Sequence, residues 1–255
     1  MFKKIAHIYT DFFPSFGIPN IALYYKVKIL SHAFFMVANW LFFVLRFISP
    51  SQMGVIEAIS FAIGMIVEIP SGAIADLLGK KVTVQIGLFM QTSGFALFLL
   101  APVSNWFIVF GNIIAICGFA MTSGAFEALA YDSMVEVKQE KNYPVVASRA
   151  GTIFPIVSIT CALLGGLLWK YNIYLPWVAT IVSFSIACIL SFKFTEPSVD
   201  TYVFSWKQFV AQNKLGLQQL LTPKLKKYLP ILFTLFASSY MLTAGIVRIF
   251  IGQQF

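Results

Sequence analysis

We predict an all-α fold for this chain, a polytopic membrane helix bundle, from its composition and from the length of its apolar runs. The 255 residues are 59% hydrophobic and 11% charged, with a mean hydropathy of +0.83, which is too apolar for a soluble domain of this size. The apolar runs are about twenty residues long, enough for an α-helix to cross about 30 Å of hydrocarbon, whereas barrel strands would alternate over about ten. Each helix then satisfies its own backbone polar groups inside the bilayer.

Six spans are expected in the first 194 residues, and a seventh near the end of the chain. A juxtamembrane anchor is expected over 1–25, with Tyr24 and Tyr25 among the aromatic residues at the headgroup level. The polar stretch 195–227 is expected to be a linker with a surface amphipathic helix. The expected spans are 28–48, 53–75, 82–102, 106–129, 150–169, 175–194 and 228–251. The predicted domains are therefore 1–194, 195–227 and 228–255.

The basic residues indicate how the spans are oriented. The net charge is +8, yet the basic residues gather in alternate loops between lipid-length runs, so membrane topology explains them better than nucleic-acid binding. Of the 18 Lys and Arg residues, all but Arg46, Lys170 and Arg248 fall on one side of the predicted membrane. Lys and Arg concentrate on the cytoplasmic side of membrane proteins. We therefore expect a multi-pass protein of the cell (inner) membrane with a cytoplasmic N-terminus.

The sequence offers little for enzyme chemistry. Cys117, Cys161 and Cys188 lie in apolar spans without paired spacing, which favours packing over disulfide or metal roles. The chain has two histidines, His7 and His32, and it has no H-E-x-x-H, G-x-S-x-G or P-loop pattern. We expect no enzymatic activity, no cofactor and no metal.

A charged turn joins the second and third spans. Gly72 would permit close helix approach and Gly79 a tight reversal, while Lys80 and Lys81 can face an anionic leaflet. The turn resembles the G-x-L-A-D-R-x-G-R-K motif between helices 2 and 3 of the major facilitator superfamily, although a simple basic loop between two spans is the alternative. The matching residues are Gly72, Ala75, Asp76, Gly79 and Lys81, with Leu77 in place of the usual basic residue.

The end of the fourth span carries two acidic residues, Glu127 and Asp132. Residues 123–132 resemble the S-G-A-x-E-A-L-x-Y-D ending of helix 4 in some bacterial facilitators. The resemblance implies that Asp132 joins Asp76, the lysines of the first turn and Arg149 in a cytoplasmic charge cluster that stabilises one state of a carrier. An ordinary solvated helix end is the other interpretation.

Carboxylates inside predicted spans are candidates for proton coupling. Glu57 and Glu68 are separated by about three helical turns and share one face of the second span. A charge near mid-membrane costs at least about 2.5 kcal/mol, so these groups and Glu127 are expected to face protein or water. For Glu57 we prefer an ion pair with Arg46, at similar depth in the preceding span, over a free transport carboxylate. For Glu68, function and structural pairing stay open.

Three amides are candidates for the substrate cavity: Asn39, Gln91 and Asn112. The alternative for each is an interhelical hydrogen bond worth about 0.6 kcal/mol. In the fifth span only Gly165 and Gly166 match the glycine pattern of drug and proton antiporters, and tight helix packing is the preferred interpretation.

The resemblance implies a secondary active transporter that moves a small molecule by alternating access, with proton-coupled efflux as the expected mode. Its partners would be a small-molecule substrate, protons and the lipid bilayer. Six spans, a linker and one more span resemble the first half of a twelve-helix carrier, so we expect a truncated chain that lacks its C-terminal half and cannot transport alone. The alternative is a non-transporting membrane interaction protein or a self-assembling half-carrier.

Overall fold

The computed structural model describes residues 15–198, together with Ile231 and Thr234. The chain divides into two compact units, Met1–Ser205 and Trp206–Phe255, and all helices named below belong to the first. This described part is helical and contains no strand, which confirms the all-α prediction. Three of its helical stretches are long and apolar enough to cross a membrane: Pro50–Glu68, Trp106–Glu136 and Glu140–Tyr171. Apart from Ile231 and Thr234, the expected seventh span lies outside the described residues, as do most of the linker and residues 1–14.

The first expected span is a broken element. Helix α2 covers Pro19–Ser31 and the short helix α3 covers Trp40–Val44, with no regular helix over 32–39. The expectation of a continuous span over 28–48 is therefore wrong, and residues 19–25 of the expected anchor lie in α2. Pro19 stands in the first turn of α2, where its missing N–H costs nothing. Tyr24 and Tyr25 are 2% and 1% exposed, so their side chains belong to the core of the helix bundle.

Two long antiparallel helices follow, α4 over Pro50–Leu78 and α5 over Lys80–Phe98. A capping box starts α4, because the Ser49 hydroxyl accepts from the Gln52 N–H at 3.2 Å and the Gln52 side chain accepts from the Ser49 N–H at 2.9 Å. A single residue, Gly79, separates the two helices with a φ of 98°. Because a side chain would be strained at that angle, glycine makes this one-residue reversal possible.

The fourth span is also broken. Helix α6 covers Trp106–Thr122 and α7 covers Ala125–Glu136, and Gly124 between them has a φ of 76°. A short 3₁₀ turn, η1, at Glu140–Asn142 leads into α8, which runs from Tyr143 to Tyr171 and starts earlier than the expected 150. Helix α9 covers Leu175–Ser191, close to the expected 175–194.

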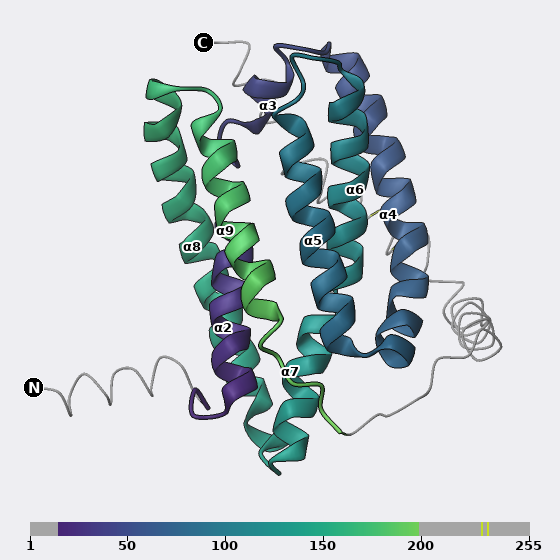
Figure 1. Cartoon of the computed structure of the whole chain (residues 1–255), viewed down its shortest axis with the longest axis vertical. Coiled ribbons are helices and arrows are strands. Elements are labelled where there is room, and N and C mark those ends of the chain that lie inside the picture. The colour runs from purple at the N-terminus through teal and green to yellow at the C-terminus, as the bar shows by residue number, and fades with distance from the viewer. Residues whose placement is uncertain (1–14, 199–230, 232–233, 235–255) are drawn as a thin grey trace, which may run out of the picture. The chain divides into compact units, whose positions relative to one another are not determined.

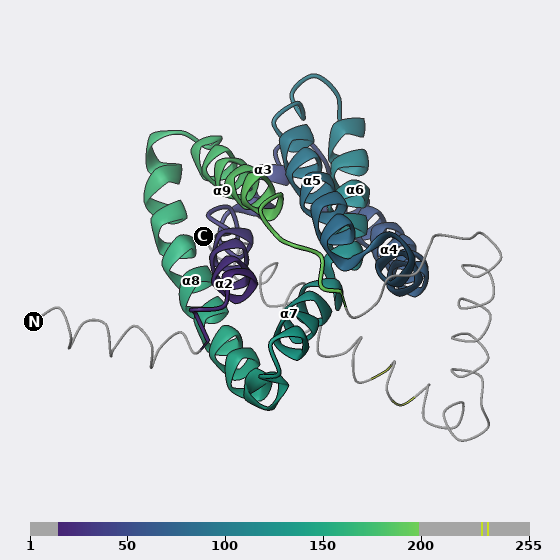
Figure 2. The same ribbon diagram turned by 60° about the horizontal axis from the view of Figure 1, so that its bottom comes forward.

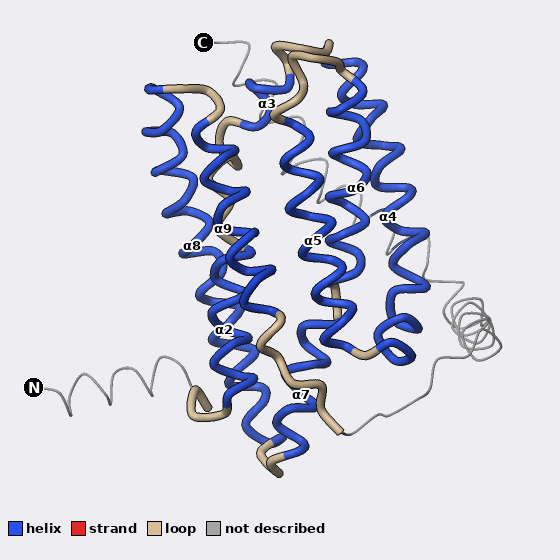
Figure 3. Tube along the Cα trace, viewed as in Figure 1, coloured by secondary structure: helices blue, strands red, loops and turns tan. Residues whose placement is uncertain are grey.

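The helices form two groups that α5, α9 and α7 connect. Helices α4, α5 and α6 pack together, α2 and α8 each pack on α9, and α5 contacts α9. Helix α7 lies at the end opposite α3 and contacts α2, α5 and α8 (Figures 1 and 2). Figure 3 shows that only short loops join these helices. One apolar cluster surrounds Tyr24 and Leu129, and a second contains Phe43, Phe98 and Trp177.

Glycines allow α5 and α6 to pack with their backbones in contact. Gly87 and Gly94 of α5 oppose Gly118 and Gly111 of α6, two helical turns apart on each helix. A Cβ atom at any of the four would lie 2.6–2.8 Å from the carbonyl oxygen of the glycine opposite. Small residues at such a crossing let helices associate through close van der Waals contact in lipid.

Candidate functional site

The charged residues at the turn between α4 and α5 differ in how far they are exposed to solvent. Lys80, at the start of α5, is buried, whereas Asp76 is exposed and Lys81 is half-buried. Gly72 is exposed, and a Cβ atom there would meet nothing within 4 Å. The expected close helix approach at Gly72 is therefore wrong within the described residues, and Gly79 alone of the two glycines has a structural requirement.

Lys80 and Asp132 form a buried ion pair between α5 and the far part of α7. The Lys80 and Asp132 side chains are 10% and 11% exposed, so the two charges neutralise each other largely out of contact with solvent. Removing one partner of such a pair leaves an uncompensated buried charge. The sequence placed these two residues in one cluster, and the structure brings them together. Arg149 is exposed on α8, within electrostatic range of Tyr25.

The residues that follow α9 cross the same end of the bundle. The Glu196 carboxylate accepts hydrogen bonds from the backbone N–H groups of Lys80 at 2.6 Å and Lys81 at 2.8 Å. These are orphan donors of the first turn of α5, where an anion is also favoured by the helix dipole. Thr195 is bonded to Asn20 of α2, whose Oδ1 accepts from the Thr195 N–H at 3.0 Å. The Ser198 hydroxyl donates to Glu136 at the end of α7, at 2.9 Å. Residues 195–198 therefore connect α2, α5 and α7.

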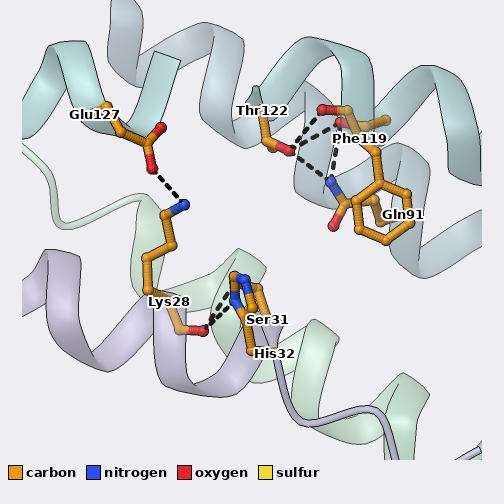
Figure 4. A network of polar contacts seen from close by, with 8 residues as sticks. Lys28, Ser31, His32, Gln91, Phe119, Thr122 and Glu127 are labelled. Carbon is orange, nitrogen blue, oxygen red and sulfur yellow. Dashed lines mark hydrogen bonds and ion pairs between the residues drawn. The ribbon is translucent and has the colours of Figure 1, made fainter. Parts of the chain in front are cut away.

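A second ion pair lies between α2 and the first turn of α7. Lys28 Nζ is 2.8 Å from Glu127 Oε1 (Figure 4). The ammonium also lies 4.8 Å from the ring centroid of Phe126 and 5.2 Å from that of Phe154, within cation–π range. The Nδ1 atom of His32 is 2.8 Å from the Lys28 carbonyl oxygen, and the His32 ring stacks on Phe154 with centroids 4.1 Å apart. The Lys28 ammonium therefore contacts aromatic rings as well as the Glu127 carboxylate.

Sequence reasoning found Glu127 but not its partner. The sequence analysis places Lys28 at the start of the expected span 28–48, on the cytoplasmic side, and gives it no partner. Lys28 lies one helical turn after Tyr24 and one before His32, so all three share a face of α2. A helix predicted to start at Pro19 would therefore have placed Lys28 on the same face as Tyr24 and His32. Glu196 had no comparable signal, since its contact is with the start of a helix more than a hundred residues away.

The three amides make contacts between structural elements. The Gln91 side chain, 2% exposed, donates from Nε2 to the Gly118 carbonyl and the Thr122 hydroxyl, each at 2.9 Å (Figure 4). Asn112 donates to Glu57 and to Ser60, each at 3.2 Å. The Asn39 side chain donates to the Gly165 carbonyl of α8 at 3.0 Å. Each amide therefore makes the interhelical hydrogen bond that was the alternative to a place in a substrate cavity.

The expected ion pair between Arg46 and Glu57 is not formed within the described residues. Arg46 is exposed and lies over the Trp169 ring, 5.7 Å from its centroid, while Glu57 accepts from Asn112. Depth in the membrane made the pair plausible, but Arg46 follows the short helix α3 in a turn and does not continue the face of a straight helix. Glu68 is exposed, and one of its carboxylate oxygens accepts from the Ser123 hydroxyl at 3.4 Å.

Gly165 and Gly166 differ in what surrounds them. A Cβ atom at Gly165 would collide with the carbonyl group of Phe35, whereas one at Gly166 would meet nothing within 4 Å. Gly165 therefore lets the irregular segment 32–39 approach α8 closely, and the packing interpretation holds for this glycine alone.

No group of three or more His, Cys, Asp and Glu side chains in the described part of the chain could hold a metal ion. Compared with known proteins, the chain matches no protein-family model and no curated protein.

Helix α7 forms two ion pairs with neighbouring helices, Glu127 with Lys28 and Asp132 with Lys80. Each could break and re-form if α7 moved relative to its neighbours.

Proposed function

We propose that the chain is a secondary active carrier of the major facilitator superfamily type. It moves a small molecule across the cell membrane by alternating access, with proton-coupled efflux as the mode, and its N-terminus is cytoplasmic. Such carriers rock between two packings around a site near the bilayer midplane. Ion pairs that exist in one packing and not in the other bias this equilibrium.

The buried ion pair between Lys80 and Asp132 carries the proposal. It joins the one-residue turn at Gly79 to α7, at the end of the bundle where residues 195–198 also attach. The pair stabilises the packing seen here if separation of α5 from α7 leaves either charge buried without its partner. The break at Gly124, with a φ of 76°, separates α7 from α6 and is where we place the hinge for a movement of α7.

Cysteine labelling in membrane vesicles tests the proposal without knowledge of the substrate. Ser123, exposed at the joint between α6 and α7, is replaced by cysteine in a chain whose three native cysteines are changed to alanine. Alternating access predicts that a membrane-impermeant maleimide labels this position in both right-side-out and inside-out vesicles. The labelling ratio should shift when Asp132→Asn breaks the ion pair.

Two control positions report the orientation. Lys138 follows α7, and Val103 lies in the turn before α6 at the opposite end of the bundle. Lys138→Cys should react only from the cytoplasmic side and Val103→Cys only from the other side. Labelling of Ser123→Cys from one side alone, unaffected by Asp132→Asn, would refute the carrier and favour a non-transporting membrane interaction protein.

A further inference from the structure

Residues 32–48, which we call the cap, run from the end of α2 through α3 to the turn before α4. They reach the end of the bundle opposite α7 (Figure 1). Over 32–39 the backbone makes turns instead of a helical ladder; for example, the Asn39 N–H donates to the Met36 carbonyl at 2.9 Å. Non-helical backbone is tolerated at membrane depth only where protein or water surrounds it. The position of the cap therefore depends on its contacts with neighbouring helices.

Two hydrogen bonds tie the middle of the cap to α8 and α9. The Asn39 amide donates to the Gly165 carbonyl of α8 at 3.0 Å, and the Met36 N–H donates to the Thr180 hydroxyl of α9 at 3.2 Å. The backbone of α3 makes few close contacts with any other helix in the described part of the chain. Side chains therefore hold α3 in place, and the bond from Asn39 is the one that adjoins this helix.

The side chains of α3 are nevertheless fully buried. Phe43 and Val44 are both 0% exposed. The Phe43 ring lies against α9, with its centroid 5.0 Å from the Trp177 ring and 5.5 Å from the Tyr174 ring. Burial of these apolar groups favours the position of α3 seen here. The short helix thus covers Trp177, which also stacks on Phe98 of α5 with ring centroids 4.6 Å apart.

Trp177 has a feature that opposes this position of α3. Its side chain is 1% exposed. Among the described residues, its Nε1 atom is the one buried side-chain nitrogen or oxygen without a hydrogen-bond partner. A buried tryptophan N–H usually donates to an acceptor, and an unpaired buried donor bears its full desolvation cost. The closed position therefore combines a gain from apolar burial with a penalty at the indole N–H.

We propose that the cap is the gate of the bundle at the end opposite α7, and that α3 swings away from Trp177 about residues 32–39. The inference rests on the proposed carrier function, for which it names the outer gate. In the closed position Asn39 is bonded to Gly165, and Val44 is buried. In the open position that bond is broken, Val44 is accessible, and water accepts a hydrogen bond from the indole N–H of Trp177.

The test is cysteine labelling of Val44→Cys in a chain whose three native cysteines are changed to alanine. A membrane-impermeant maleimide is added from the side on which Val103→Cys reacts. Val44→Cys should label slowly, and the additional change Asn39→Ala should raise the labelling rate about fivefold, as expected for the loss of one hydrogen bond. Asn20→Ala, which removes amide bonds in the part of the bundle that contacts α7, should leave the rate unchanged.

Ile108→Cys distinguishes opening of the cap from loosening of the whole end. Ile108 lies in the first turn of α6, is 0% exposed and belongs to the same apolar cluster as Val44. It is not part of the cap, so Ile108→Cys should stay unlabelled with and without Asn39→Ala. Labelling of Ile108→Cys as fast as that of Val44→Cys would overturn the proposal, and so would a Val44→Cys variant that never reacts.

A second measurement keeps Val44 unchanged. Hydrogen exchange of the Trp177 indole N–H is followed by nitrogen-15 NMR of the full chain in lipid nanodiscs, with its resonance identified by its loss in Trp177→Phe. Because the same opening exposes both groups, Asn39→Ala should speed this exchange by the same factor as the labelling of Val44→Cys. An exchange rate that Asn39→Ala does not change contradicts the gate.

The two proposals fail in distinguishable ways. If Ser123→Cys labels from both sides of the membrane but Val44→Cys never reacts, the carrier stands and another element is its outer gate. If Val44→Cys responds to Asn39→Ala as expected but Ser123→Cys labels from one side only, the cap opens and the carrier is wrong.

Discussion

Replacing Lys80 by methionine should destabilise the protein far more than the same change at the next residue. The Lys80→Met variant leaves Asp132 buried and unpaired, and removing one member of a buried pair costs about 3–5 kcal/mol. Because the Lys80 and Asp132 side chains keep about a tenth of their area exposed, we expect the lower end, about 3 kcal/mol, or about 150-fold in the folding constant. The free energy of unfolding is measured by titration with sodium dodecyl sulfate in mixed micelles, followed by circular dichroism.

Lys81→Met is the matched control. The Lys81 side chain is half-buried and its contact with Glu196 is made through the backbone N–H, so its loss should cost less than about 0.5 kcal/mol. The double variant Lys80→Met and Asp132→Leu should return to within about 1 kcal/mol of wild type, because apolar residues of similar volume replace a buried pair at little cost. A Lys80→Met variant as stable as Lys81→Met would refute the role given to the pair, and so would a double variant as unstable as the two single changes added together.

Four further variants test the helix packing and the capping of α5. Gly94→Ala should cost about 1–3 kcal/mol in the same titration, because its Cβ would lie 2.7 Å from the Gly111 carbonyl oxygen; Gly166→Ala, with open space at its Cβ, should be neutral or stabilise by up to about 1 kcal/mol. Gly165→Ala should speed proteolytic cleavage within 32–39, since the added methyl group collides with the Phe35 carbonyl; protection equal to that of Gly166→Ala would contradict the close approach. Glu196→Gln should cost about 0.5–1 kcal/mol and raise hydrogen exchange at the amides of residues 80 and 81; unchanged exchange there would mean that the carboxylate does not cap α5.

Apolar length predicted most of the helices, because a run that crosses a bilayer leaves little choice of secondary structure. Helices α4, α5, α8 and α9 all contain the centres of spans expected from hydropathy alone. The turn at Gly79 was also predictable, since glycine next to two lysines ends one apolar run and starts another. The placement of Asp132 near the lysines of that turn came from a motif resemblance and not from periodicity.

Hydropathy failed where polar side chains are satisfied inside the bundle. Residues 19–31 contain Asn20 and Lys28, which a window of average hydropathy treats as solvent-facing, yet Asn20 bonds to Thr195 and Ser133 and Lys28 pairs with Glu127. The first span therefore seemed to begin later than it does. Likewise, equal depth in two neighbouring spans did not bring Arg46 and Glu57 together, because depth carries no information about which way a side chain points.

Helix α7 connects the two ion pairs mechanically. Glu127 and Asp132 are five residues apart, about 140° around the helix, so one reaches Lys28 of α2 while the other reaches Lys80 of α5. The Gly124 break before α7 carries no side chain that would resist rotation. A displacement that lengthens the bond to Lys80 must also change the geometry at Lys28, because a 12-residue helix moves as one body. The pairs at Lys28 and Lys80 should therefore be coupled without any contact between them, so the destabilisation caused by Asp132→Asn should differ between wild type and a Glu127→Gln background.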